Sequence, residues 1–165
     1  MRRKDREMPR DFAEGILDGC EWAVLSMVTP EGKPYCVPLT IVREGEWVYF
    51  HAAKEGKKLD CLRENPAVCM ACVGYTHRMP DKFTTEFESA ILEGRAEEVA
   101  DEKEKIHALR LLCQRHTPAN MGEFDAAIAR SLQATAVWKI HIDALTGKRK
   151  RYGPDGRQMK RDAAV

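Results

Sequence analysis

The sequence predicts a mainly β, α+β domain, in which a six-stranded antiparallel, barrel-like sheet carries peripheral helices. Short apolar or alternating segments recur along the chain, and turns rich in glycine and proline separate them. The regular alternation of strand and helix that is typical of a parallel sheet does not occur. The expected strands cover residues 22–28, 35–43, 46–51, 67–73, 83–99 and 135–142.

The first three strands are joined by short turns, which predicts an antiparallel meander. Side chains alternate between the two faces of a strand. In the third strand, Val48 and Phe50 therefore share one face, while Tyr49 and His51 share the other.

Helical segments and turns fill the rest of the chain. Residues 74–82 are expected to form an irregular loop, Gly94 to mark a bulge, and Thr146–Gly147 to turn the chain into a basic tail. Helices are expected over residues 2–19, over a short segment that ends at Asn65–Pro66, and over residues 101–116 and 123–133.

The 165 residues suit one domain, which we place at residues 1–149, followed by a basic tail at 150–165. The formal net charge of +1 argues against a nucleic-acid-binding protein. The tail is either solvated or helps to bind an anionic ligand or partner. There is no apolar run long enough to cross a membrane, and the charged N-terminus lacks the apolar segment of a signal peptide. We therefore expect a cytoplasmic protein that is not bound to membranes.

The segment from His51 to Pro66 is the main candidate site. It follows a strand and contains Gly56 and three lysines before a short helix begins. Backbone N–H groups at a helix start and nearby cations both attract an anion, so the segment is a candidate phosphate site. The alternative is a solvated, lysine-rich loop. His51 adjoins the lysines and is either structural or functional.

Metal and nucleophile chemistry find little support in the sequence. Cys69 and Cys72 have the spacing of a zinc pair, but no second pair accompanies them. Residues three apart in a strand point to opposite faces, so we interpret both as core cysteines and expect no metal site. The common dinucleotide, P-loop and hydrolase signatures are also absent from the sequence. Trp138, on the last strand, is either a core residue or a wall on which a ring stacks.

Taken in order, several short motifs resemble a known family. They are Val37-Pro-Leu-Thr40, a strand that ends Tyr49-Phe-His51, Gly56-Lys-Lys58, Asn65-Pro66 and Glu93-Gly94-Arg95. Their order and spacing resemble the FMN-binding split barrel of the pyridoxamine 5′-phosphate oxidase superfamily. The Phe83-Thr-Thr-Glu-Phe-Glu-Ser89 strand and Val137-Trp-Lys-Ile-His-Ile142 are similar to its nitroimidazole-resistance branch.

The resemblance implies a homodimer of split barrels with FMN between the subunits and a small-molecule substrate. It assigns the FMN phosphate to Lys57 and Lys58, and the ring edge to Val37, Pro38, Leu39 and Thr40. His51, Ala52 and Ala53 would line the ribityl and ring region. Ser89 falls where the oxidases place a ring-contacting glutamine, and Trp138 would contribute from the partner.

Three functional hypotheses follow from this resemblance. The first is an FMN-dependent reductase of the nitroimidazole-reductase type, in which His51 has a pKa near neutrality and donates a proton to the substrate. The second is a flavin- or haem-binding carrier or sensor without turnover, with His51, His77 or His141 as a candidate axial ligand. The third is a binding protein that uses a deazaflavin. The substrate-phosphate residues of true pyridoxamine phosphate oxidases are not found, which argues against vitamin B6 oxidation.

Overall fold

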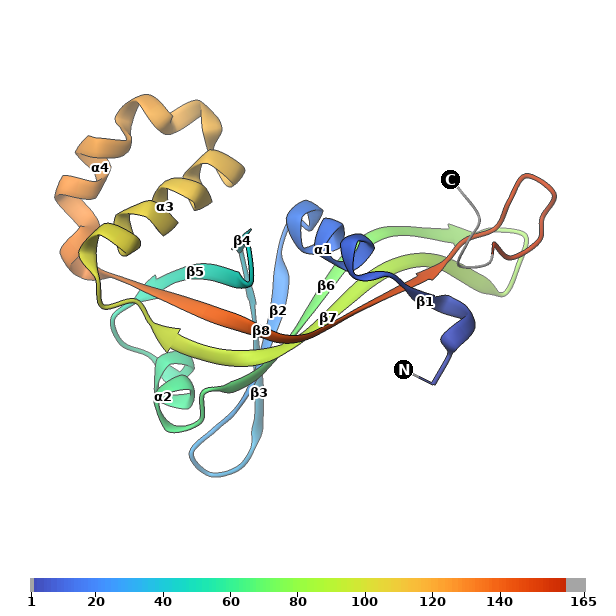
Figure 1. Ribbon diagram of the computed structural model, residues 1–165, viewed down its shortest axis with the longest axis horizontal. Helices are drawn as coiled ribbons and strands as arrows, with labels where there is room; N and C mark the ends of the chain where they lie inside the picture. The colour runs from blue at the N-terminus through green and yellow to red at the C-terminus, as the bar shows by residue number, and fades with distance from the viewer. Residues whose placement is uncertain (1, 160–165) are drawn as a thin grey trace.

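The computed structural model describes residues 2–159 and shows an antiparallel sheet with helices around it (Figure 1). Within this range the sheet has eight strands in the order β3-β2-β6-β7-β8-β5-β4, and β1 pairs separately with β8. The strands are β1 (Glu7–Met8), β2 (Ala23–Val28), β3 (Pro34–Leu39), β4 (Val42–Glu44), β5 (Trp47–Ala53), β6 (Ala67–Met79), β7 (Thr84–Glu98) and β8 (Thr135–Lys150).

The two edge strands of this sheet are consecutive in the chain. β3 ends at Leu39 and β4 begins at Val42, although they lie at opposite ends of the strand order. The two-residue link Thr40–Ile41 therefore joins one edge to the other and closes the sheet into a barrel. This confirms the predicted mainly β, antiparallel barrel.

The predicted number of six strands is wrong, because two short strands were missed. The expected strand 35–43 is interrupted at Thr40–Ile41, where side chains of a distant helix bind the carbonyl of Ile41. β1 lies within the segment predicted as one helix, 2–19. Pro9 explains its separation, because proline disfavours helical backbone in the residue before it.

Helices cover three parts of the barrel (Figure 1). α1 packs on β6, β7 and β8, and α2 lies in the connection between β5 and β6. α3 and α4, which we call the helical cap, are inserted between the paired strands β7 and β8. The helical elements are η1 (Lys4–Arg6), α1 (Arg10–Gly19), α2 (Lys57–Glu64), α3 (Glu102–His116), η2 (Pro118–Glu123), α4 (Phe124–Ser131) and η3 (Leu132–Ala134).

The expected loop at residues 74–82 is instead the outer part of a long β6–β7 hairpin, which projects away from the helical cap (Figure 1). Most side chains from Tyr75 to Arg78 are exposed, so this part has no alternation of apolar residues to reveal a strand. The turn itself is confined to residues 80–83.

The expected turn at Thr146–Gly147 is also wrong, because β8 continues to Lys150. A Cβ atom on Gly147 would lie 3.0 Å from the Phe12 ring and 3.1 Å from the Ala13 Cβ atom. The glycine thus allows α1 to approach the strand closely, and it does not reverse the chain.

Two hydrophobic clusters lie on opposite sides of β5. Val48 and Phe50 point into the barrel core, whereas Tyr49 belongs to a second cluster beneath the helical cap. This confirms the prediction that Val48 and Phe50 share one face of β5 and Tyr49 the other. Because His51 lies on the same face as Tyr49, it is on the cap side.

Gly94 lies at an irregularity in the β7–β8 pairing, as predicted. Glu93 pairs with Ala144 and Gly94 with Ile142, so Asp143 on β8 is the extra residue of a bulge. A Cβ atom on Gly94 would lie only 2.0 Å from the His141 carbonyl oxygen. The two strands can pass at this point only if residue 94 is glycine.

The basic tail begins within β8 at Lys150, and residues 151–159 fold back in a small turn that places the Met159 N–H 2.8 Å from the Arg151 carbonyl. Arg151 lies over the Tyr75 ring, with its guanidinium carbon 3.7 Å from the ring centroid. The remaining tail, 160–165, lies outside the described residues. Among the helices of residues 2–159, none combines the length and the apolar composition that a membrane span requires.

Candidate functional site

The lysine-rich turn forms the uncapped start of a helix. Gly56 is the N-cap of α2 and has φ 130°, a backbone conformation that side-chain-bearing residues rarely adopt. Its carbonyl accepts hydrogen bonds from the N–H groups of Leu59 and Asp60, at 2.8 and 3.2 Å. Gly56 has no side chain that could bind the earlier N–H groups, so those of Lys57 and Lys58 are left for solvent or an anionic ligand.

The lysine side chains add positive charge at this helix start. The Nζ atom of Lys57 lies 4.5 Å from the Tyr35 ring centroid, and that of Lys58 lies 5.4 Å from the Phe50 ring centroid. Burial lowers the pKa of Lys58. Within the part of the chain that the structure describes, neither lysine takes part in a salt bridge. The charge of Lys57 contributes to a lowered pKa of Glu31. Two cations outside salt bridges, beside free N–H groups, are the features that an anion site requires.

His51 lies near the end of β5, between this turn and the helical cap. Burial lowers its pKa below the ordinary 6.5, and electrostatic interactions with Lys58 and His116 lower it further. The ring is therefore largely neutral at pH 7, when it offers one N–H donor and one acceptor nitrogen. The sequence did not reveal the burial of this ring or the nearby Lys58, which together lower its pKa.

A cavity of about 650 Å³ separates the helical cap from the barrel. Thr40 and His51 contribute to its lining from the barrel side, so two of the predicted flavin-contacting residues border it. The cap side is mostly apolar. The lining residues are Glu21, Thr40, His51, Leu109, Leu112, Cys113, His116, Thr117, Phe124, Ala127, Ile128, Ser131 and Thr135.

Two side chains at the end of α3 hold the cap in place over this cavity. Arg115 donates to the carbonyl oxygens of Ile41 at 2.9 Å and Cys20 at 2.7 Å. The Nε2 atom of His116 lies 2.8 Å from the Ile41 carbonyl oxygen. Because a carbonyl only accepts hydrogen bonds, Nε2 carries the proton and Nδ1 remains available. These bonds join α3 to the link that closes the barrel.

The other predicted cofactor-binding residues near this site come from β3 and β5. Val37, Leu39 and Ala52 are half-buried and pack against the barrel core. Pro38 and Ala53 are exposed. β3 pairs only with β2 in the sheet, so the backbone groups along its other edge remain available to a ligand.

Ser89 and Trp138 lie elsewhere in the chain. Ser89 is on the outer face of β7, opposite Val73 on β6 and Lys148 on β8. Trp138 is only 3% exposed and belongs to the barrel core, where its Nε1 atom is buried without a hydrogen-bond partner. A contact between Trp138 and a flavin would require the ring to leave that core.

Sequence reasoning missed Glu21, His116 and the apolar wall of the cap. In α3, the lining residues Leu109, Leu112, Cys113 and His116 have the spacing of one helical face. Such a spacing is typical of any helix that packs on a core, so the sequence did not reveal that this face of α3 borders a cavity.

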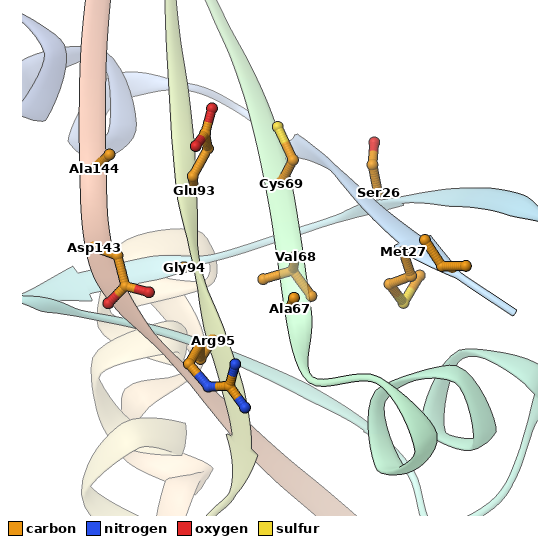
Figure 2. Close-up of a pocket in the computed structure, with 11 residues that line it drawn as sticks. Ser26, Met27, Ala67, Val68, Cys69, Glu93, Gly94, Arg95, Asp143 and Ala144 are labelled. Carbon is orange, nitrogen blue, oxygen red and sulfur yellow. The ribbon is translucent and has the colours of Figure 1, made fainter. Parts of the chain in front are cut away.

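The outer face of β2, β6 and β7 is partly exposed and carries both apolar and polar side chains. Cross-strand pairing places Val24, Ala71 and Ile91 in one row, and Ser26, Cys69 and Glu93 in the next. Figure 2 shows the second row, which borders a shallow hollow of about 500 Å³ at Gly94. Cys72 belongs to the barrel core while Cys69 is half-buried on this outer face, which confirms that the two thiols point to opposite sides. The interpretation of Cys69 as a core cysteine is wrong, because its face of β6 lies outside the barrel. The more exposed apolar side chains here and at its margin are Trp22, Val73 and Ile91.

His51 predicts a pH dependence of stability. Its folded-state pKa is lowered, whereas the unfolded chain titrates near 6.5. Between these values the unfolded chain binds a proton that the folded chain does not, so stability should fall as pH falls below 6.5. Above 6.5 the residue contributes no pH dependence. Urea unfolding at pH 7.5 and 5.5 should therefore show a smaller loss at low pH for His51→Gln than for the wild type. Equal losses in both proteins would contradict the lowered pKa.

Comparisons with known proteins were consistent with this geometry. The sequence model of the family described as pyridoxamine 5′-phosphate oxidase matches residues 9–149. A search of the curated proteins found no match. Among solved structures, a candidate 5-nitroimidazole antibiotic resistance protein from Bacteroides thetaiotaomicron is 26% identical, with a TM-score of 0.70 over 86% of this chain and 84% of that chain.

Two further solved structures have the same fold. The flavocytochrome Anf3 from Azotobacter vinelandii is 27% identical, with a TM-score of 0.73 over 93% of this chain and 71% of that chain. The FAD and haem binding protein from Mycobacterium smegmatis is 22% identical, with a TM-score of 0.75 over 88% and 73%. At this lower identity, the last similarity supports the fold alone.

Proposed function

Because the chain belongs to the pyridoxamine 5′-phosphate oxidase family, we propose that it is an FMN-dependent reductase of small aromatic or heterocyclic molecules, of the nitroimidazole-reductase type. The observation that supports this proposal most strongly is the position of His51. It lies between an anion site at Lys57–Lys58 and a cavity large enough for a small ligand. The similarity to a candidate 5-nitroimidazole antibiotic resistance protein points to the same substrate class.

The residues present fit a flavin mononucleotide. Lys57, Lys58 and the free N–H groups of α2 would hold its phosphate. The exposed edge of β3 around Val37–Thr40 would hold the ring edge, and His51 would lie on the substrate side. When bound, the flavin supplies the electron transfer. The neutral His51 ring would orient the substrate through its N–H group. As this proton passes to the reduced substrate, the other ring nitrogen would take up a proton from solvent, so the ring stays neutral.

The proposal is tested first by the identity of the chromophore. Purified protein should show a flavin absorption spectrum, or acquire one when FMN is added. After anaerobic photoreduction, addition of a 5-nitroimidazole should restore the oxidised spectrum. Protein that binds no added FMN, or a reduced flavin that the nitro compound does not reoxidise, would contradict the proposal.

His51→Ala should slow the reoxidation step about a hundredfold while FMN remains bound, since a positioned proton donor contributes about 10²- to 10⁴-fold. Stopped-flow spectroscopy of the photoreduced protein measures this step. The control is His107→Ala, because His107 is exposed on α3 and its Nε2 atom lies 2.9 Å from a Glu44 carboxylate oxygen. An unchanged rate for His51→Ala would remove its proposed role.

A haem- or flavin-binding carrier is the second candidate, because similar structures include a flavocytochrome. The histidines first considered as ligands, His51, His77 and His141, are all exposed, and the Nδ1 atom of His141 lies 2.8 Å from an Asp143 carboxylate oxygen. His51 is the one that borders the cavity beneath the cap. A Soret band in the purified protein would favour this alternative, and a tightly bound deazaflavin would favour the third hypothesis.

We propose further that two copies of the chain associate through the outer face of β2, β6 and β7, with FMN at the interface. The support is the exposed apolar side chains on this face, Ile91 at 37% exposure and Val73 at 53%. Ile91→Asp should convert a dimer into a monomer in light scattering, because it introduces a charge into the apolar contact. Ala129→Asp, on the exposed surface of α4, is the control. A wild-type monomer would overturn the dimer proposal.

A further inference from the structure

We propose that the cavity beneath the helical cap is the substrate site, and that it selects uncharged aromatic molecules over anionic ones of the same shape. This inference rests on the proposed function for the identity of the reaction. It adds where the substrate binds, which segment forms its wall and which residue rejects anions.

The wall of the cavity is built for a flat apolar molecule. Phe124, Ala127, Ile128 and Ser131 line it from α4, at the spacing of a single helical face. The lining residues of α3 have the same spacing, so two helical faces converge on the cavity. Its volume of about 650 Å³ falls within the range of small-molecule sites, where apolar walls surround a few polar groups.

Polar groups gather on the barrel side and at the end of α3. The neutral ring of His51 and the hydroxyl of Thr40 border the cavity from the barrel. His116 contributes from α3, where its Nε2 proton is held by the Ile41 carbonyl. The His51 ring and the Thr40 hydroxyl can bind the oxygen or nitrogen atoms of an uncharged ring substituent without adding a full charge of their own.

The charged groups around the cavity disfavour an anion. Among its lining residues, Glu21 is the acidic one, and none is lysine or arginine. Arg115 is nearby, but its guanidinium group already donates to the carbonyls of Cys20 and Ile41. Lys58, whose charge lowers the pKa of His51, is assigned to the FMN phosphate. A carboxylate in the cavity would therefore lie near the Glu21 charge without a cation of its own. Because Glu21 is exposed, we expect the resulting discrimination to be about fivefold.

The cavity should be formed before a ligand binds. Arg115 and His116 connect the end of α3 to the barrel link, and Phe124 anchors the start of α4 in the cluster shared with Tyr49. A preformed site spends little binding energy on ordering the protein. Direct binding measurements on the purified protein are therefore suitable, and they do not require turnover.

The test compares 4-nitrobenzamide with 4-nitrobenzoate, which have nearly the same shape and differ in charge at pH 7.5. Calorimetric titration of the oxidised wild-type protein should give an affinity for the amide about fivefold higher than for the benzoate. Glu21→Gln should raise the benzoate affinity severalfold and leave the amide affinity unchanged. Equal wild-type affinities, or a Glu21→Gln variant with unchanged preference, would overturn the proposed selection.

The location is tested by a matched pair of substitutions on α4. Ala127→Trp fills the cavity and should weaken amide binding at least tenfold, whereas Ala129→Trp, on the exposed side of the same helix, should have no effect. Amide binding that survives Ala127→Trp in a folded protein would overturn the location. If Ala127→Trp does not fold, the exposed Glu21→Gln substitution still tests the site.

Failure of this inference is distinguishable from failure of the proposed function. Protein that binds no FMN but binds the amide with these dependences on Glu21 and Ala127 supports the substrate site and contradicts the flavin-dependent reductase. Protein that reduces nitroimidazoles, but whose amide binding is indifferent to both substitutions, retains its function and loses this site.

Discussion

The double variant Lys57→Ala/Lys58→Ala should bind FMN about a hundredfold more weakly than the wild type. Hydrogen bonds to charged groups contribute about 1.5–3 kcal/mol each, and about 1.4 kcal/mol corresponds to a tenfold change in affinity. Lys57 is exposed and Lys58 only half-buried, so the lower end of that range applies to each. Quenching of flavin fluorescence on titration measures the affinity.

Two controls separate phosphate binding from a structural role of the lysines. Lys54→Ala removes a nearby exposed lysine that follows β5 directly, and it should leave FMN affinity unchanged. Riboflavin lacks the phosphate, so the double variant and the wild type should bind it equally. A comparable loss of affinity for riboflavin would show that the lysines shape the site and do not hold the phosphate.

Gly94→Ala should destabilise the protein by about 3 kcal/mol or more, within the range of severe single substitutions. The added methyl group would meet the His141 carbonyl oxygen at 2.0 Å and the Ile140 side chain at 3.0 Å. The oxygen belongs to the backbone of a paired strand, so relief requires β7 and β8 to separate around the bulge. Urea unfolding followed by circular dichroism measures the loss.

Gly15→Ala is the matched control for this substitution. Gly15 lies inside α1, and a Cβ atom there would have no neighbour within 4 Å. Alanine favours the helix over glycine by about 1 kcal/mol, so this variant should be slightly more stable than the wild type. A Gly94→Ala protein as stable as Gly15→Ala would mean that the two strands do not approach as described.

The barrel was predictable where burial leaves a pattern in the sequence. The alternation of Val48, Tyr49 and Phe50 predicted which face of β5 enters the core, and the glycine at position 94 predicted the bulge. The hairpin beyond Gly74 was missed because its exposed side chains do not alternate. β4 was missed because the interruption at Thr40–Ile41 depends on hydrogen bonds from Arg115 and His116, which are more than seventy residues away.

The candidate site divides in the same way. The candidate anion site at Lys57–Lys58 is local, since one glycine, two lysines and a helix start provide it. The helix start was predicted from the sequence and is confirmed, and anion binding there stays a prediction. The cavity is not local. Its lining includes residues from the segment after α1, where Glu21 lies, from the end of β5, and from two helices between β7 and β8. The lowered pKa of His51 has the same origin, since Lys58 and His116 come from different elements.

The helical cap occupies a segment that the barrel does not need for its own connectivity. β7 and β8 are antiparallel neighbours, and their pairing reaches Glu98 and Trp138, next to the points where the cap begins and ends. A tight turn could join these strands directly. The segments that close the barrel and carry Lys57–Lys58 are therefore separate in the chain from the segment that forms the cavity wall. Insertions, deletions and sequence drift within the cap can reshape the cavity while the barrel keeps its strand order.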